Sequence, residues 1–144
     1  EVQSVLDEGQ TYLERIRKCN DLILGQEISD KISKMELIVQ NIFQRVQGHP
    51  EVVPDLKKMM DYYLPTTVKL LDAYAELDAQ PVQVENITNS KREIEQTLDT
   101  LNQAFEKLLD QIFRDTAWDV STDISVLQTL LAQEGLIGDD FKLN

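Results

Sequence analysis

Cysteine and histidine are nearly absent from this sequence, which contains one residue of each, Cys19 and His49. A single cysteine excludes an intramolecular disulfide and the cysteine sets that bind structural zinc. A single histidine excludes any site that requires two histidine ligands. Cys19 lies on an apolar stripe without a phosphate-binding loop and arginine after it, and His49 stands between Gly48 and Pro50 in a predicted turn. We therefore predict a buried, unreactive thiol, a surface histidine and a cytoplasmic location.

Glycine and proline are also scarce, with five and four residues among 144, whereas 42% of the residues are hydrophobic. This composition excludes a disordered polar chain and a turn-rich β protein. No apolar run reaches the roughly 18 residues that a helix needs to cross a bilayer. The length fits one ordinary domain, so the sequence predicts a single helical domain over residues 1–144.

Positive charge is in deficit, because 14 Lys and Arg residues face 26 Asp and Glu residues and give a formal net charge of -12. Nucleic acid and anionic lipid surfaces both require a basic patch. The densest basic group, formed by Arg15, Arg17 and Lys18, has Glu14 and Asp21 beside it and is typical of a solvated helix face. We therefore expect no nucleic acid partner, and the protein partner stays unknown.

Apolar residues recur at steps of three and four in four stripes, which is the spacing of helices with one buried face. The first stripe runs from Val2 to Ile23 and the second from Ile28 to Val46, with a strong stop signal at 48–50. The third stripe comprises Leu56, Met60, Tyr63, Thr67, Leu70, Tyr74 and Leu77, and the fourth comprises Ile94, Leu98, Leu101, Phe105, Leu109, Phe113, Ala117, Val120, Ile124, Leu127 and Leu131.

Pro65 lies beside the third stripe, within the least regular of the predicted helices. A proline inside a helix removes a backbone hydrogen bond and costs about 3 kcal/mol without compensation. Because the helical period continues on both sides, we predict a kinked helix, with the hydroxyl of Thr66 or Thr67 capping freed carbonyls. A clean break is the alternative, and 78–88 is the predicted principal loop.

The fourth stripe predicts a long helix that begins at a capping box, Ser90 to Glu93. Three successive steps of four between Phe105 and Ala117 resemble a stutter in a heptad pattern. Asp119 or Ser121 could cap a separate last helix, so we expect either one long helix or a helix pair that bends near Trp118.

Together the stripes predict an all-α fold, an antiparallel helical bundle of four to five helices with a long C-terminal helix or helix pair and a Pro-kinked third helix. A long dimeric coiled coil is the alternative, and a homo-oligomer fits either arrangement. The prolines divide the chain too often for one continuous rod.

Catalytic motifs are missing: there is no glycine-rich phosphate loop, no Gly-x-Ser-x-Gly elbow and no zinc-type cysteine set. We therefore predict no catalytic residue and no cofactor. Asp115, Asp119 and Asp123 recur at steps of four and would line one side of a helix, where a Mg²⁺ or Ca²⁺ ion could offset their repulsion. A row of solvated carboxylates is the favoured interpretation, and the cation site is the weaker candidate.

Polar and aromatic residues around Pro65 are the second group of candidates. They could satisfy one another's hydrogen bonds at a kink, or they could face a ligand or partner. Trp118 lies off the fourth stripe and would mark an interface if it is exposed. The candidate interaction surface consists of Tyr62, Tyr63, Pro65, Thr66, Thr67, Tyr74 and Trp118.

The block 62–74 and the tail 115–127 resemble the XpaC family, which is named for hydrolysis of 5-bromo-4-chloroindolyl phosphate. The resemblance extends over nearly the whole chain, from Glu8–Leu13 through Leu98–Asn102 and Ala104–Leu109 to Gly135. The family is more distantly similar to toxic-anion (tellurite) resistance proteins of the TelA type, and its members occur mainly in Gram-positive bacteria.

The resemblance implies a helical protein whose family name records a cellular phenotype and carries no catalytic residues over to this chain. It also implies membrane association through a hydrophobic N-terminal segment ahead of the helical part, with the helices on the cytoplasmic side. From the residues and the resemblance together we expect a non-enzymatic helical interaction or regulatory module, linked to phosphate-ester hydrolysis or envelope stress. A phosphate-ester hydrolase that uses a carboxylate-bound metal is the alternative.

Overall fold

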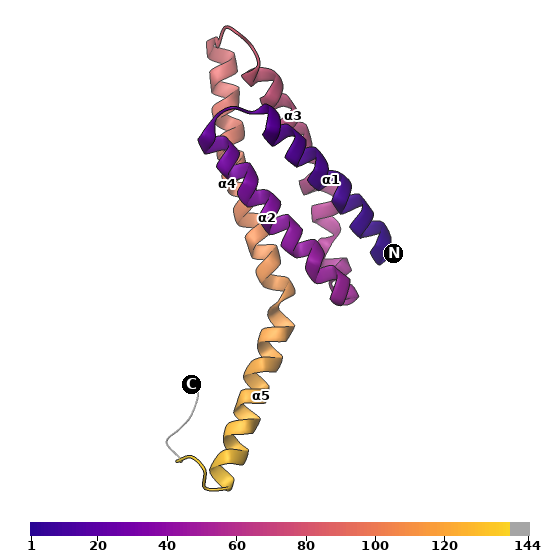
Figure 1. The fold of residues 1–144 in the computed structure, drawn as a ribbon, viewed down its shortest axis with the longest axis vertical. Helices are drawn as coiled ribbons and strands as arrows, with labels where there is room; N and C mark the ends of the chain where they lie inside the picture. Colours follow the sequence, from indigo (N-terminus) through magenta and orange to yellow (C-terminus); the bar gives the residue numbers. More distant parts are fainter. Residues whose placement is uncertain (139–144) are drawn as a thin grey trace. The chain divides into compact units, whose positions relative to one another are not determined.

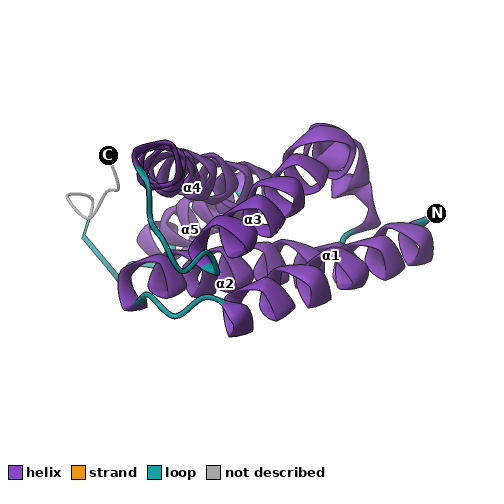
Figure 2. Cartoon of the chain, turned by 90° about the horizontal axis from the view of Figure 1, so that it is seen from above, coloured by secondary structure: helices purple, strands orange, loops and turns teal. Residues whose placement is uncertain are grey.

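The computed structural model describes residues 1–138, which form helices joined by short connections and contain no strand (Figures 1 and 2). The elements are α1 (Val2–Leu22), α2 (Gln26–Gly48), the 3-10 helix η1 (Pro50–Leu56), the π-helix η2 (Met59–Tyr63), α3 (Leu64–Asp78), α4 (Glu85–Ile112) and α5 (Arg114–Gln133). The all-α prediction is therefore confirmed. Within the described residues, none of the helices is both long enough and apolar enough to span a membrane.

The chain divides into two compact units, Glu1–Leu109 and a second unit that begins at Asp110. The first unit contains α1, α2, η1, η2, α3 and most of α4. The second unit contains the end of α4 and all of α5.

Two antiparallel helix pairs build the first unit. In the α1–α2 pair, the Asn20 amide donates to the Ser33 hydroxyl at 3.1 Å, and the Ser29 hydroxyl donates to the Asn20 carbonyl oxygen at 2.7 Å. In the α3–α4 pair, Lys91 binds Asp78 at 2.9 Å. Glu95, one turn later in α4, accepts a hydrogen bond from Tyr74, one turn earlier in α3. Residue numbers therefore rise along one helix of this pair as they fall along the other.

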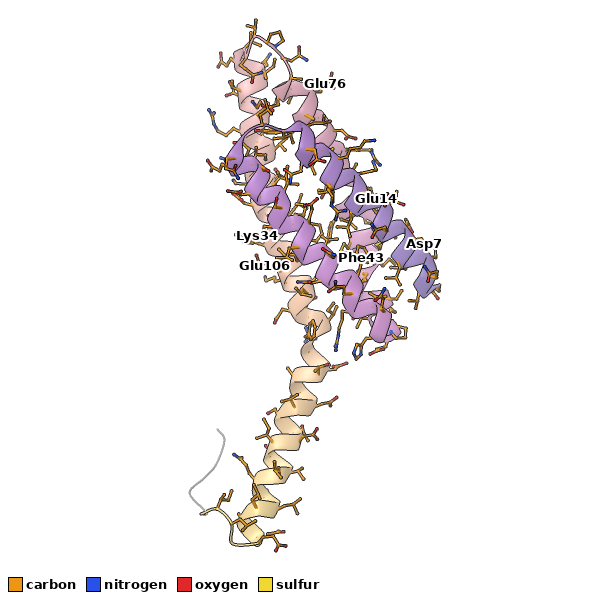
Figure 3. All side chains as sticks on the ribbon, viewed as in Figure 1. Asp7, Glu14, Lys34, Phe43, Glu76 and Glu106 are labelled. Carbon is orange, nitrogen blue, oxygen red and sulfur yellow. The ribbon has the colours of Figure 1, made fainter. Side chains whose placement is uncertain are left out.

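The two pairs pack side by side with α2 against α4. Lys31 binds Asp99 and Lys34 binds Glu106, both at 2.9 Å, so residue numbers rise together along these two helices (Figure 3). On the other side Arg15 of α1 binds Asp72 of α3 at 3.1 Å. The two helices of each pair are thus antiparallel. Helices α2 and α4, which belong to different pairs and lie side by side, run in the same direction.

The predicted first and second stripes supply much of the core. Every large apolar residue of the second stripe is buried, and α2 contributes more buried side chains than any other element for which buried residues are given. These side chains are Ile28, Ile32, Met35, Ile38, Val39, Ile42, Phe43 and Val46. Their burial supplies the main driving force for assembling the unit, at roughly 1.5 to 3 kcal/mol for each large side chain.

The helix around Pro65 keeps its helical path but changes its hydrogen-bond register. The chain is helical from residue 57 to Asp78, and the π-helix η2 lies immediately before the proline. A π-turn inserts one extra residue into the helical period. As a result Leu64 is fully buried and Tyr63 is exposed, which corrects the predicted third stripe by one position. The alternative, a clean break at the proline, does not occur.

Both predicted boundaries in the C-terminal part need correction. Helix α4 begins at Glu85, so the proposed capping box at Ser90 lies inside the helix and the connection after α3 is shorter than predicted. The predicted helix pair is present, but α4 and α5 meet at Phe113, whose φ of -99° and ψ of 2° leave the helical range. Neither Asp119 nor Ser121 caps α5, because both lie within it.

Gly9 allows the close approach of α1 and α2. It is buried within α1, and a Cβ built on it would overlap the ring of Phe43. A glycine inside a helix costs about 1 kcal/mol relative to alanine. The close packing of the Phe43 ring against the α1 backbone offsets that cost.

We predict that Gly9→Leu lowers the free energy of unfolding by about 2 kcal/mol, because overpacking by the new side chain outweighs its better helix propensity. Urea unfolding followed by circular dichroism measures the change. Gly48→Leu is the control, since Gly48 ends α2 with no atom within 4 Å of a new Cβ. Equal stabilities of the two variants would contradict this account of Gly9.

Candidate functional site

The three carboxylates proposed for a cation all lie on α5 and are all exposed. Asp115, Asp119 and Asp123 follow one another by one turn each, so they form a row along one helix. Among the described residues, no group of three or more His, Cys, Asp or Glu side chains is arranged to hold a metal ion. The row therefore offers solvated oxygens without the convergent ligand set of a metal centre.

The residues around Pro65 divide into an exposed part and a buried part. Tyr62 and Tyr63 are 66% and 39% exposed, and Thr66 is exposed as well. Pro65 is half-buried. These four residues stay candidates for a contact surface on the first unit.

Thr67 and Tyr74 are buried, so they are not part of the exposed surface around Pro65. The Thr67 hydroxyl donates to the carbonyl oxygen of Tyr63, as the sequence predicts for a threonine beside the proline. Its burial is therefore matched by a hydrogen bond within its own helix. Its role is to satisfy the backbone of this irregular turn.

Tyr74 belongs to a polar cluster that joins α3 to α4. Its hydroxyl donates to Glu95 at 2.6 Å, and the Lys91 ammonium lies 5.5 Å from the centre of its ring. Lys91 also binds Asp78 at 2.9 Å and Gln83 at 3.1 Å. Burial raises the pKa of Tyr74 above its ordinary value, and the hydrogen bond to Glu95 raises it further. The phenol therefore stays protonated and serves as a hydrogen-bond donor between helices.

Cys19 is likewise held as a donor. The Sγ atom lies 3.1 Å from a carboxylate oxygen of Asp72, and the other oxygen of Asp72 accepts from Arg15. Burial raises the pKa of the Cys19 thiol to about 12, and the hydrogen bond to Asp72 adds to the effect. Only the thiolate is a strong nucleophile, so this cysteine connects α1 to α3 and is unsuited to nucleophilic catalysis.

The most unusual apolar surface lies on α5, which buries none of its residues. Val120, Ile124 and Leu127 are 52%, 40% and 55% exposed and follow one another at steps of four and three. We call these three residues, with Ala117 and Leu131 at the same spacing, the α5 stripe. The sequence predicts it as a continuation of the core, whereas the structure leaves it open to solvent.

Trp118 lies beside the α5 stripe and is 74% exposed, as an interface residue would be. A shallow groove of the second unit runs past it. The groove is lined by Asp110, Phe113, Arg114, Ala117, Trp118 and Ser121. This exposed tryptophan and the stripe give α5 the aromatic and aliphatic groups that are enriched in protein interfaces.

The sequence contains one signal that could have identified this surface in advance. From residue 115 to residue 138 there is no lysine or arginine, although the segment carries four acidic residues. A core helix in a mixed-charge bundle usually pairs its acidic flank with basic residues of its neighbours, as Lys31 and Lys34 of α2 do with α4. Apolar periodicity alone cannot distinguish a stripe that is buried in the core from an exposed stripe that binds a partner.

Residues 1–127 match the family described as 5-bromo-4-chloroindolyl phosphate hydrolysis protein. The chain belongs to this family. No curated protein and no solved structure matches the chain. The family match includes the acidic row, the residues around Pro65 and Trp118, and it ends within α5 at Leu127 of the α5 stripe.

For this member of the family we predict a pH dependence that reports the buried thiol. The pKa of Cys19 is 9.0 when unperturbed and about 12 in the fold, so the unfolded chain loses its thiol proton first as pH rises. The stability that the protonated Cys19 thiol contributes is therefore fully present below pH 9 and is lost progressively as pH rises toward 12. Between pH 8 and pH 10 the wild type should lose about 1.4 kcal/mol more than Cys19→Ser, which keeps a donor but does not titrate. Urea unfolding at each pH measures the difference, and identical pH profiles would contradict the assignment.

Proposed function

We propose that this protein is a non-enzymatic helical module that acts through protein contacts, linked to a phosphate-ester hydrolysis or envelope-stress phenotype. The observation that carries the proposal is the α5 stripe, a row of aliphatic side chains on a helix that buries none of its residues. Contiguous exposed apolar surface marks interaction sites in soluble proteins, whereas isolated exposed residues are ordinary.

The groups that would perform chemistry support the same proposal, because they are used to join helices. The thiol of Cys19 is tied to Asp72, and the phenol of Tyr74 is tied to Glu95. Burial and these hydrogen bonds keep both groups protonated, which is the opposite of the activation that a nucleophile needs. Tyr62, Tyr63, Pro65 and Thr66 form a second, smaller candidate contact surface.

The family description fits this proposal if it names a phenotype. Hydrolysis of a chromogenic phosphate by cells can depend on regulation, on export or on envelope permeability. We extend the proposal to an envelope role on the cytoplasmic side, with membrane association through an N-terminal segment of the kind that the family resemblance implies.

A phosphate-ester hydrolase is the second candidate, because the family description names hydrolysis of a phosphate ester. It would use Asp115, Asp119 and Asp123 to bind a divalent metal ion. Metal-assisted phosphoryl transfer needs oxygens that converge on the ion. Three exposed carboxylates in line along one helix do not provide that convergence without a large rearrangement.

Hydrolysis of 5-bromo-4-chloroindolyl phosphate by the purified chain distinguishes the two candidates. The assay is run without metal and with Mg²⁺, Mn²⁺ or Zn²⁺, on the wild type and on Asp119→Asn. We predict no turnover above the buffer rate in any condition, with circular dichroism showing that both proteins are folded. Metal-dependent turnover that Asp119→Asn abolishes would establish the hydrolase and overturn the proposal.

A further inference from the structure

The α5 stripe has the spacing of a helix that receives another helix. Ala117, Val120, Ile124, Leu127 and Leu131 alternate steps of three and four, which is the pattern of a coiled-coil seam. Val126 and Leu130 are also more than half exposed and widen the apolar surface on one side. A partner that inserts one side chain into a groove, or that presents a flat surface, would not require this period. A partner helix that lies along α5 would require it.

Carboxylates border the stripe. Asp115, Asp119 and Asp123 follow one another by four residues, and the same step leads next to Leu127 of the stripe. Asp119 and Asp123 also directly precede Val120 and Ile124 in the chain. The acidic row therefore runs obliquely along α5 and reaches the edge of the stripe at Asp123.

The charge of this segment is of one sign. After Arg114, which begins α5, the chain has no basic residue through residue 138. A second copy of α5 would bring more carboxylates and only one basic residue, Arg114 at its first position, to pair with them. An anionic lipid surface would be repelled in the same way. A helix with basic flanks supplies the missing charges, and opposite charges beside an apolar seam select the partner in helix pairing.

We propose that the α5 stripe binds an amphipathic helix of a partner protein whose apolar face is flanked by lysine or arginine. The inference rests on the proposed function and narrows it from protein contact in general to one class of partner. Apolar contacts with Val120, Ile124 and Leu127 supply most of the affinity. An ion pair with Asp123 and the negative charge of the rest of the acidic row select a basic partner over a neutral or acidic one.

The test uses two synthetic helical peptides of three heptads that differ only in charge. Both carry leucine at positions a and d, and positions e and g hold lysine in one peptide and glutamate in the other. Isothermal titration of the full chain should give a dissociation constant on the order of 10 μM for the lysine peptide. The glutamate peptide should bind at least about tenfold more weakly, and added salt should weaken the lysine peptide most.

Matched variants separate the apolar contribution from the charge. Ile124→Asp should weaken the lysine peptide about tenfold or more, whereas Thr122→Asp, which adds the same charge on the opposite face of α5, should bind at least as tightly as the wild type. The double variant Asp119→Asn, Asp123→Asn should bind the lysine peptide about fivefold more weakly and lose most of the preference between peptides. None of these four residues is buried, so circular dichroism should show wild-type helix content.

Three outcomes would overturn the inference. If both peptides bind equally and Ile124→Asp abolishes this binding, the proposed contact module stands, but its partner need not be basic. Self-association of the wild type that Ile124→Asp disrupts, with no binding of either peptide, would make a second copy the occupant. If Ile124→Asp changes neither peptide binding nor oligomeric state, the α5 stripe is not a contact surface, and the proposed function loses the observation that carries it.

Discussion

Burial of the apolar face of α2 is the constraint on which the first unit depends. Helix α1 packs against α2, and ion pairs and the hydrogen bond from Asn102 to the Lys31 carbonyl oxygen join α2 to α4, so both neighbours must fit its surface. Polar contacts then fix the register at the rim, as in the Lys31–Asp99 and Lys34–Glu106 pairs. These exposed or partly exposed ion pairs add little stability individually. They matter because they hold α2 and α4 in one parallel alignment.

The sequence predicts the helices of the first unit well because hydrophobic periodicity reports burial directly. The stripe from Ile28 to Val46 is buried as predicted, and its stop at Gly48 is the observed end of α2. The one-residue slip between Tyr63 and Leu64 could not be predicted, since it depends on the π-turn that η2 makes before Pro65. The early start of α4 escaped prediction because Ser90 satisfies a local capping rule that the longer helix overrides.

The candidate sites likewise include features that the sequence predicts and features that it cannot predict. The sequence places Trp118 off the fourth stripe, where the structure finds it exposed, and it predicts that Cys19 on the first stripe is buried, as observed. It places Thr67 and Tyr74 on the stripe but cannot show that their hydroxyls are taken up by Tyr63 and Glu95. It also cannot show that the same periodic pattern is buried at Ile94, Leu98 and Phe105 and exposed along most of α5, since a pattern does not reveal what covers it.

The chain therefore combines a stable helical unit with a helix whose apolar face is open. The thiol of Cys19 and the phenol of Tyr74 form hydrogen bonds between helices of the first unit, whereas α5 exposes apolar and acidic side chains. Most helical stability in proteins comes from packing of an apolar face, so α5 without a partner should be much less stable than α2. A partner that covers the α5 stripe would supply the missing packing energy.

Amide hydrogen exchange of the free chain tests this claim most directly. Local opening free energies range from near zero to the full unfolding free energy, so the rates of α5 and α2 can be compared within one molecule. We predict that amides of α5 exchange at least about a hundredfold faster than those of α2 in dilute protein, and that the lysine peptide slows exchange in α5 alone. Equal protection of α5 and α2 in dilute protein without a partner would contradict the account, because the α5 stripe would then already be covered.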